Sequence, residues 1–115
     1  MSTIEIPFSY EMAVAIIDGK KVATTRREAK GQIGDMFLIQ DPRYDPNGWT
    51  AERHRHLFRV IEILEIDDLT IVKTVYYHLE GFDSPEAFEK TWRALHRGHF
   101  TLNKDYVVHF FGRIA

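Results

Sequence analysis

The segment HLFRVIEILEI, residues 56–66, predicts a long β-strand that is apolar on both of its faces. Side chains alternate along a strand, so its apolar residues divide into two sets, Leu57, Ile61 and Ile63 on one face and Phe58, Val60 and Leu64 on the other. A strand with two apolar faces has to be covered on both sides. The segment therefore predicts a curved sheet or small barrel that is covered by helices.

The segments before this strand predict two shorter strands and one helix. Alternating apolar residues indicate a strand over 4–8, and a second apolar run indicates a strand over 36–40. Between them, residues 10–18 have helical spacing, with Ser9 as the cap and Gly19 as the stop. The stretch after Gly19 is polar and basic, and we expect it to be a loop that enters a further strand.

The segments after the long strand predict two helices and a final strand. One helix starts at Asp67 and stops near Gly81, and the next opens with Ser84-Pro85-Glu86 and ends at Gly98. Residues 106–111 form an apolar, aromatic strand. The predicted order is β-α-β-β-β-α-α-β, which is an α+β fold.

Composition limits the classes of protein to which the chain can belong. With 115 residues, of which 44% are hydrophobic, it predicts a single domain over 1–115. It has no cysteine, which excludes disulfides, thiolate metal sites and cysteine nucleophiles. The chain has 17 acidic and 15 basic residues, so any binding of nucleic acid has to depend on a local basic patch. No apolar run is long enough to cross a bilayer and no signal-like segment starts the chain, so we expect a cytoplasmic protein without a membrane partner.

The segment after Gly19 gathers four cations and two hydroxyls within eight positions: Lys20, Lys21, Thr24, Thr25, Arg26 and Arg27. On a strand, Thr24 and Arg26 share one face, so a hydroxyl and a guanidinium point into the same cleft. A lysine near other cations has its charged form disfavoured, and a neutral amine can accept a proton from a threonine nucleophile. A charged lysine would bind phosphate or carboxylate instead, and a solvated turn is the third interpretation.

Motifs along almost the whole chain resemble the ASCH domain family. They are Gly19-Lys20-Lys21 followed by Thr24-x-Arg26, Gly34-Asp35 before an apolar strand, Glu80-Gly81-Phe82 before the Ser84-Pro85-Glu86 helix, and the strand 106–110. The resemblance implies a PUA-like small β-barrel with flanking helices. It also implies a cleft between barrel and helices that binds RNA or a nucleobase-like ligand.

The chain is most similar to the small bacterial ASCH proteins that are amidohydrolases on N4-acetylcytidine. That resemblance implies that Lys21, Thr24 and Glu80 are catalytic. Thr24 would attack the acyl carbon, Lys21 would hold or accept its proton, and Glu80 would pass a proton to the leaving exocyclic amine. Arg26 would orient the ligand or stabilise charge. A structural ion pair between Lys21 and Glu80, without any reaction, is the rival interpretation.

A second basic stretch interleaves cations with aromatic residues. Tyr44 and Trp49 lie in the loop 41–53, close in sequence to Arg53 and Arg55, and this pattern suits stacking on single-stranded RNA bases with phosphate contacts. An edge strand kept apart from other chains by its charge is the alternative. The predicted ligand-binding residues are thus Lys20, Arg26, Arg27, Tyr44, Trp49, Arg53 and Arg55.

Three functional hypotheses remain from the sequence. The first is an amidohydrolase on N4-acylated cytidine, the second a non-catalytic RNA-binding module, and the third a binding protein for another small anionic ligand. The expected partner is a nucleoside-like small molecule or single-stranded RNA. We expect no cofactor and no metal site, and we interpret His109, within an apolar strand, as a residue of the core or of the barrel mouth with satisfied hydrogen bonds.

Overall fold

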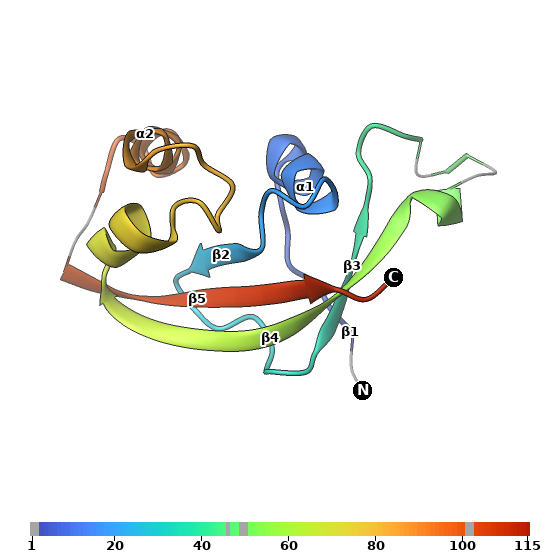
Figure 1. The fold of residues 1–115 in the computed structure, drawn as a ribbon, viewed down its shortest axis with the longest axis horizontal. Coiled ribbons are helices and arrows are strands. Elements are labelled where there is room, and N and C mark those ends of the chain that lie inside the picture. The colour runs from blue at the N-terminus through green and yellow to red at the C-terminus, as the bar shows by residue number, and fades with distance from the viewer. Residues whose placement is uncertain (1–2, 46, 49–50, 101–102) are drawn as a thin grey trace.

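The computed structural model describes residues 3–45, 47–48, 51–100 and 103–115, which form one five-stranded mixed sheet with helices packed against it (Figure 1). The strand order is β1-β3-β4-β5-β2. The elements in chain order are β1 Thr3–Ile4, α1 Tyr10–Ile17, β2 Ala23–Arg26, β3 Met36–Gln40, η1 Ala51–His54, β4 Arg55–Asp68, η2 Val72–Tyr76, α2 Pro85–Leu95 and β5 Asn103–Arg113. No described helix is long and apolar enough to cross a membrane.

The two longest strands, β4 and β5, form the curved spine of the sheet (Figure 1). They pair antiparallel from Phe58 opposite Arg113 to Asp68 opposite Asn103, and the register shifts between Val60 and Glu62. An extra residue at such a bulge bends its strand and increases the local twist. This bend lets one pair of strands pack against helices at both of its ends.

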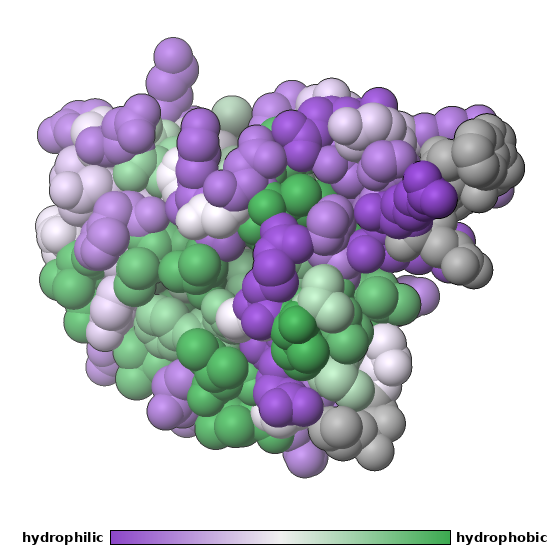
Figure 2. Space-filling view, turned by 45° about the vertical axis from the view of Figure 1, so that its right-hand side comes forward, coloured by the Kyte–Doolittle hydropathy of each residue, from purple (hydrophilic) through white to green (hydrophobic). Residues whose placement is uncertain are grey.

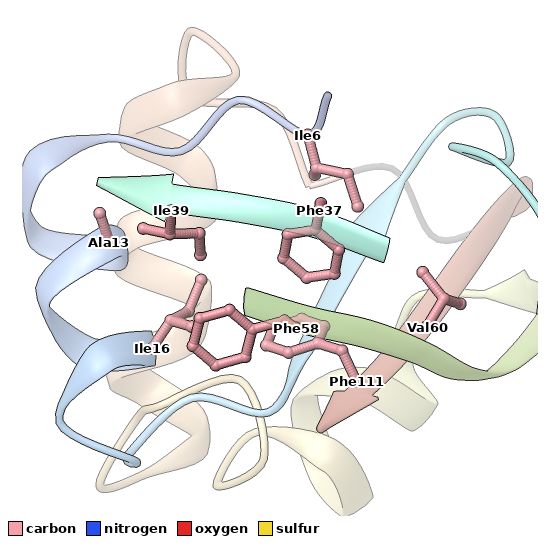
Figure 3. Packing of buried hydrophobic residues seen from close by; sticks show 8 residues of the cluster. All are labelled: Ile6, Ala13, Ile16, Phe37, Ile39, Phe58, Val60 and Phe111. Atoms are coloured by element: carbon pink, nitrogen blue, oxygen red, sulfur yellow. The ribbon is translucent and has the colours of Figure 1, made fainter. Parts of the chain in front are cut away.

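Two hydrophobic clusters cover opposite faces of β5. Phe111 belongs to the first cluster, in which side chains of α1, β3 and β4 pack around Phe37 (Figure 3). Tyr106 and Val108 belong to the second, which includes Phe88 and Trp92 of α2. These positions differ by an odd number of residues, so they project from opposite faces. Along β4, Phe58, Val60 and Ile63 pack in the first cluster and Leu64 in the second. The prediction of two apolar faces is therefore explained by two separate cores, but the predicted division of faces is wrong beyond the bulge after Val60, where the alternation shifts.

The predicted closure of the sheet into a barrel is wrong. Within the described residues, β1 pairs with β3 and β2 pairs with β5, so the two edges of the sheet do not meet. Both edge strands are short, with two residues in β1 and four in β2, and they offer few main-chain hydrogen bonds for closure. The apolar pattern of β4 indicated two covered faces, which an open curved sheet also provides.

The outer side of the open sheet carries much of the exposed hydrophobic surface. In Figure 2 hydrophobic residues gather over the lower part of the molecule, where the strands lie, and hydrophilic residues over the helices above. Leu38 of β3 and Ile61 of β4 are both more than half exposed. The sheet is therefore covered by helices on part of its surface only.

The two α-helices begin as their caps predict. The Ser9 hydroxyl accepts a hydrogen bond from the Met12 N–H, and the Ser84 hydroxyl accepts one from the Ala87 N–H. Gly19, which follows α1, has a left-handed backbone conformation with φ 81°. These local signals are strong because each satisfies main-chain groups that a helix end leaves free.

Two elements differ most from the prediction. The strand expected over 4–8 ends at Ile4, although Ile6 is still buried in the first cluster. Pro7, within the expected range, has no N–H for a ladder. The helix expected from Asp67 to about Gly81 is only the π-helical turn η2 followed by tight turns. This segment is rich in β-branched residues, which lose side-chain freedom in a helix.

Candidate functional site

A cavity of about 520 Å³ opens beside β2, which runs between α1 and α2 (Figure 1). Its polar floor is formed by Lys21, Thr24, Thr25 and Glu80. Its walls are largely apolar, and they include Phe8 and Met12 on the side of α1 and Phe82, Phe88 and Trp92 on the side of α2. A volume of this size is typical of small-molecule sites.

Lys21 and Glu80 form a buried ion pair on the floor of the cavity. The Lys21 ammonium lies 3.1 Å from Glu80 Oε1 and donates a second hydrogen bond to the Glu80 main-chain oxygen at 3.2 Å. The two residues are only 3% and 4% exposed. Burial lowers the pKa of Lys21, while the charge of Glu80 and their hydrogen bond act in the opposite direction. An amine in this setting loses its proton more readily than a surface lysine.

Two glycines allow the two halves of this pair to approach each other. Gly19 turns the chain after α1, so the Lys21 N–H donates to the Ala15 carbonyl at 3.1 Å. Gly81 has φ 96°, and a Cβ at that position would lie 3.2 Å from the Lys21 Cβ. The turn that carries Glu80 can therefore lie directly against Lys21 because residue 81 has no side chain.

The two threonines of β2 occupy different positions around the pair. Thr25 donates its hydroxyl hydrogen to Glu80 Oε2 at 2.5 Å, so each carboxylate oxygen of Glu80 has its own partner. Thr24 lies on the opposite face of the strand and also lines the cavity, with 5% of its surface exposed. Among the described residues, the Thr24 hydroxyl has no hydrogen-bond partner, so it remains available to a ligand.

Arg26 connects the cavity to the segment before α1. Its guanidinium donates to the Pro7 carbonyl at 2.6 Å and lies 5.1 Å from the centre of the Phe8 ring. Its Nε is buried, and within the described part of the chain it has no hydrogen-bond partner. Burial lowers the pKa of Arg26, and the charge of Glu80 opposes this effect. Arg26 thus brings a positive charge to the same side of β2 as Thr24.

His109 supports the cavity from below β2. It is fully buried, and its Nε2 accepts a hydrogen bond from the Lys30 N–H at 2.8 Å. Its Nδ1 lies 3.3 Å from the Thr24 carbonyl oxygen, which accepts only if Nδ1 carries the proton. These contacts fit a neutral imidazole with one defined tautomer. They agree with its interpretation as a core residue with satisfied hydrogen bonds.

The predicted site residues divide into three groups. Lys21, Thr24, Glu80, Arg26 and Arg27 all line the cavity, although Lys21 and Glu80 are 59 residues apart in the sequence. Lys20 is exposed and does not line it. The remaining residues belong to the second basic stretch.

The second basic stretch lies away from the cavity, around the loop that joins β3 to β4. The Tyr44 ring stacks on His54 with 3.7 Å between ring centres, and Arg55 donates to the Gln40 side chain at 3.3 Å. Tyr44, Arg53 and Arg55 are exposed, and none of them lines the cavity. Trp49 lies outside the described residues. The structure therefore separates two groups of predicted ligand-binding residues.

Sequence reasoning missed the role of Thr25 as the partner of Glu80. Alternation along β2 places Thr25 on the face of the second cluster, the side from which Glu80 approaches. That periodicity was present in the sequence. The sequence does not indicate that residue 80 lies near this face, because that proximity depends on the turn after η2.

No family model and no curated protein matches the sequence. Solved structures do match in fold. An ASCH domain from Lactobacillus crispatus JV V101 has a TM-score of 0.62 at 14% identity, over 97% of this chain and 77% of that one. An ASCH protein from Zymomonas mobilis has a TM-score of 0.59 at 16% identity, over 89% of this chain and 61% of that one. A DUF984 protein from Enterococcus faecalis V583 has a TM-score of 0.57 at 14% identity, over 90% and 67%.

Proposed function

We propose, from the premise that this chain has the fold of an ASCH domain, that its cavity hydrolyses the acyl amide of N4-acylated cytidine. The observation that carries the proposal is that the buried Lys21–Glu80 pair and Thr24 line one cavity. The chain spans 61 to 77% of the length of the structures that it resembles, so its activity is argued from its own residues.

The buried pair supplies an acid and a base by moving one proton. Burial of two opposite charges costs several kcal/mol each in lost hydration, which reduces the free-energy difference between the ion pair and its neutral form. Transfer of a proton from Lys21 Nζ to Glu80 Oε1, across 3.1 Å, converts the ion pair into an amine and a carboxylic acid. The amine accepts the Thr24 proton, and the acid protonates the leaving nitrogen.

The reaction then proceeds in two balanced steps. Thr24 Oγ1 attacks the acyl carbon, Lys21 takes its proton, and Glu80 protonates N4 as the C–N bond breaks. This step leaves an acyl ester on Thr24, an ammonium and a carboxylate. Water attacks the ester, its proton goes to Glu80, and Lys21 returns a proton to the departing Thr24 oxygen. The products are cytidine and the carboxylic acid.

The rest of the cavity suits this substrate. The Arg26 guanidinium lies on the Thr24 side of β2 and can stabilise the negative charge that develops on the acyl oxygen. Phe8, Phe82 and Trp92 offer apolar surface to a flat pyrimidine ring. A nucleoside is compatible with a cavity of about 520 Å³.

The test is release of cytidine from N4-acetylcytidine by the purified chain, followed by chromatography. Lys21→Ala, Thr24→Ala and Glu80→Ala are each expected to abolish turnover. Lys90→Ala removes an exposed ammonium of α2 outside the cavity and is expected to leave turnover unchanged. Circular dichroism establishes that each variant is folded. Undiminished activity of Thr24→Ala contradicts the nucleophile assignment.

A non-catalytic RNA-binding module is the second proposal, because an aromatic ring and cations are exposed together outside the cavity. Tyr44 is 48% exposed, and the exposed guanidinium groups of Arg53 and Arg55 lie in the segment that leads into β4. Under this proposal Tyr44→Ala and Arg55→Ala weaken binding of single-stranded oligonucleotides, and affinity falls as salt rises. Absence of turnover together with such binding favours this function. A cytoplasmic location remains a prediction under both proposals.

A further inference from the structure

The main chain of β2 has one free edge, because β2 is the last strand of the sheet. Its ladder with β5 pairs Ala23 with Phe110, Thr24 with His109 and Thr25 with Val108. Antiparallel pairs alternate between those that exchange main-chain hydrogen bonds and those that do not. The Phe111 N–H donates to the Val22 carbonyl at 3.0 Å, which makes Thr24 a bonded position and Ala23 and Thr25 non-bonded ones.

The N–H and C=O of a non-bonded residue point away from the partner strand. Ala23 illustrates this, since its N–H donates to the Leu79 carbonyl at 3.0 Å on the side opposite β5. The turn around Leu79 thus covers the edge of β2 as far as Ala23. Thr25 is the next residue that points outward, and among the described residues its N–H and C=O have no partner.

These two main-chain groups belong to a residue that lines the cavity. The cavity is lined by Thr24 and Arg26 from one face of β2 and by Thr25 from the other. A cavity that contacts both faces of a strand passes around its free edge or its end, and Thr25, the residue before the last of β2, lies close to both. Thr25 is 7% exposed, and a buried N–H and C=O without partners cost free energy. A ligand that presents an acceptor beside a donor relieves this cost.

We propose that the main chain of Thr25 recognises the heterocycle of the substrate, an inference that rests on the proposed function. The Thr25 N–H donates to a ring nitrogen, and the Thr25 carbonyl accepts the hydrogen of the neighbouring exocyclic nitrogen. The substrate class is then acylated amines of nitrogen heterocycles in which the amide nitrogen stands next to an unprotonated ring nitrogen. N4-acylcytosine has this edge, with N3 as acceptor and N4–H as donor.

The same pose brings the amide to the acid. The Thr25 hydroxyl donates a hydrogen bond to Glu80 Oε2 at 2.5 Å. An exocyclic amide nitrogen that donates its hydrogen to the Thr25 carbonyl therefore lies near the Glu80 carboxyl group. One residue thus orients both the heterocycle, through its main chain, and the proton donor, through its side chain. An acylated aniline lacks the ring nitrogen and leaves the Thr25 N–H unpaired, which reduces its affinity.

The test compares inhibition of the purified chain by cytidine and by 3-deazacytidine, in which C–H replaces N3. Neither compound carries an acyl group, so binding is measured without the chemical step. Cytidine is expected to bind about 10- to 100-fold more tightly, as when a site loses a partner for a buried donor. Calorimetry gives the same ratio if the chain has no turnover to inhibit.

A main-chain substitution tests whether the ratio of the two affinities, for cytidine and 3-deazacytidine, depends on the Thr25 N–H. Replacing Thr25 by its α-hydroxy acid changes the N–H to an ester oxygen and keeps the side chain and the carbonyl. The ratio is expected to fall to about 1, whereas the same ester at Glu86, in the first turn of α2, leaves it unchanged. Equal binding of both nucleosides to the unmodified chain, or a ratio that survives the Thr25 ester, overturns the inference.

The two proposals fail in different ways. Turnover of N4-acetylcytidine with no preference for the ring nitrogen leaves hydrolysis standing and rejects recognition by Thr25. Preference for cytidine without turnover rejects hydrolysis and retains recognition. Binding of neither nucleoside, together with no turnover, rejects both.

Discussion

At the scale of single residues, the site depends on how the carboxylate of Glu80 is held. Lys21 occupies one of its oxygens and Thr25 the other, so the carboxyl plane has a fixed orientation in the cavity. A proton donor that is held in place loses less entropy on reaching its transition state than one that rotates. Thr25 is therefore a positioning residue for Glu80 in the proposed reaction.

Removing the Thr25 hydroxyl is expected to slow turnover without weakening binding. Thr25→Val keeps the shape of the side chain and its main chain, and we expect kcat on N4-acetylcytidine to fall about tenfold with KM little changed. Thr25→Ser restores the hydroxyl and is expected to recover most of kcat. Steady-state kinetics of the two variants provide the measurement, and equal loss in both would indicate a packing defect instead.

The neutral state of His109 makes the stability of the fold depend on pH. Burial lowers the pKa of His109, and the charge of Arg26 acts in the same direction, while the hydrogen bond to Thr24 and the charge of Glu80 oppose it. The unfolded chain therefore binds the proton first as pH falls. The contribution of His109 to stability is complete above its unfolded pKa near 6.5 and decreases below it.

Urea denaturation between pH 7 and pH 5 measures this effect. The free energy of unfolding is expected to fall on acidification, with His109 contributing a slope of up to about 1.4 kcal/mol per pH unit. His109→Gln offers a donor and an acceptor without titrating, so its unfolding free energy should fall less steeply. Parallel pH profiles for the two chains would show that other groups cause the dependence.

Sequence reasoning reached the residues of the site unevenly. Strand alternation predicted that Thr24 and Arg26 share a face, and they do line one cavity. Glu80 entered through resemblance to a family, because nothing local indicates that residue 80 meets residue 21. The partnership of Thr25 with Glu80 and the free edge of β2 depend on sheet order, which residue patterns do not encode.

At the scale of elements, turns position the site more than helices do. The segment from η2 to α2 carries Glu80 into the cavity through tight turns, with hydrogen bonds such as Glu80 N–H to the Tyr76 carbonyl at 3.1 Å. The apolar residues Leu69, Val72, Tyr76 and Leu79 of this segment pack in the second cluster from these turns. The caps at Ser9 and Ser84 were predictable since each signal lies within four residues of the helix that it starts.

Gly81 is expected to be more sensitive to substitution than a glycine of the same conformation elsewhere. Gly81 and Gly34 both have φ 96°, so alanine at either position strains the backbone by about 1–3 kcal/mol. At Gly81 the new Cβ also meets Lys21 at 3.2 Å, whereas at Gly34 no atom lies within 4 Å. We expect Gly81→Ala to lower both stability and kcat.

Gly34→Ala is the matched control, expected to lower stability alone. Thermal denaturation measures the first effect and turnover of N4-acetylcytidine the second. The same loss of kcat in both variants would show that Lys21 is not displaced by the added methyl group.

At the scale of the whole molecule, two cores on an open sheet replace the predicted barrel. The α+β class and the ASCH fold were predictable, the first from periodicity and the second from the order of motifs. Closure was not, because an apolar pattern on both faces of β4 has the same appearance in a barrel and in a sheet with two helical coverings. The difference depends on whether the short edge strands β1 and β2 meet.

The first core is expected to dominate stability around its aromatic centre. Phe37 is 1% exposed and packs against Phe58 and Phe111 with 5.7 and 5.3 Å between ring centres. Phe37→Ala is expected to lower the free energy of unfolding by about 3–5 kcal/mol. The adjacent Leu38 is 55% exposed, so Leu38→Ala should change it by less than about 1 kcal/mol. Urea unfolding of the two variants tests the contrast, and similar losses would contradict the assignment of faces.

The position of β5 between β4 and β2 has a consequence for synthesis on the ribosome. Every other element leaves the exit tunnel before β5, yet β2 gains its place in the sheet only by pairing with it. A nascent chain therefore holds Thr24 and Thr25 outside the sheet until β5 has left the tunnel and can pair with β2. Messenger RNAs that are truncated before the β5 codons would yield polypeptides that contain all the proposed catalytic residues but do not assemble the site.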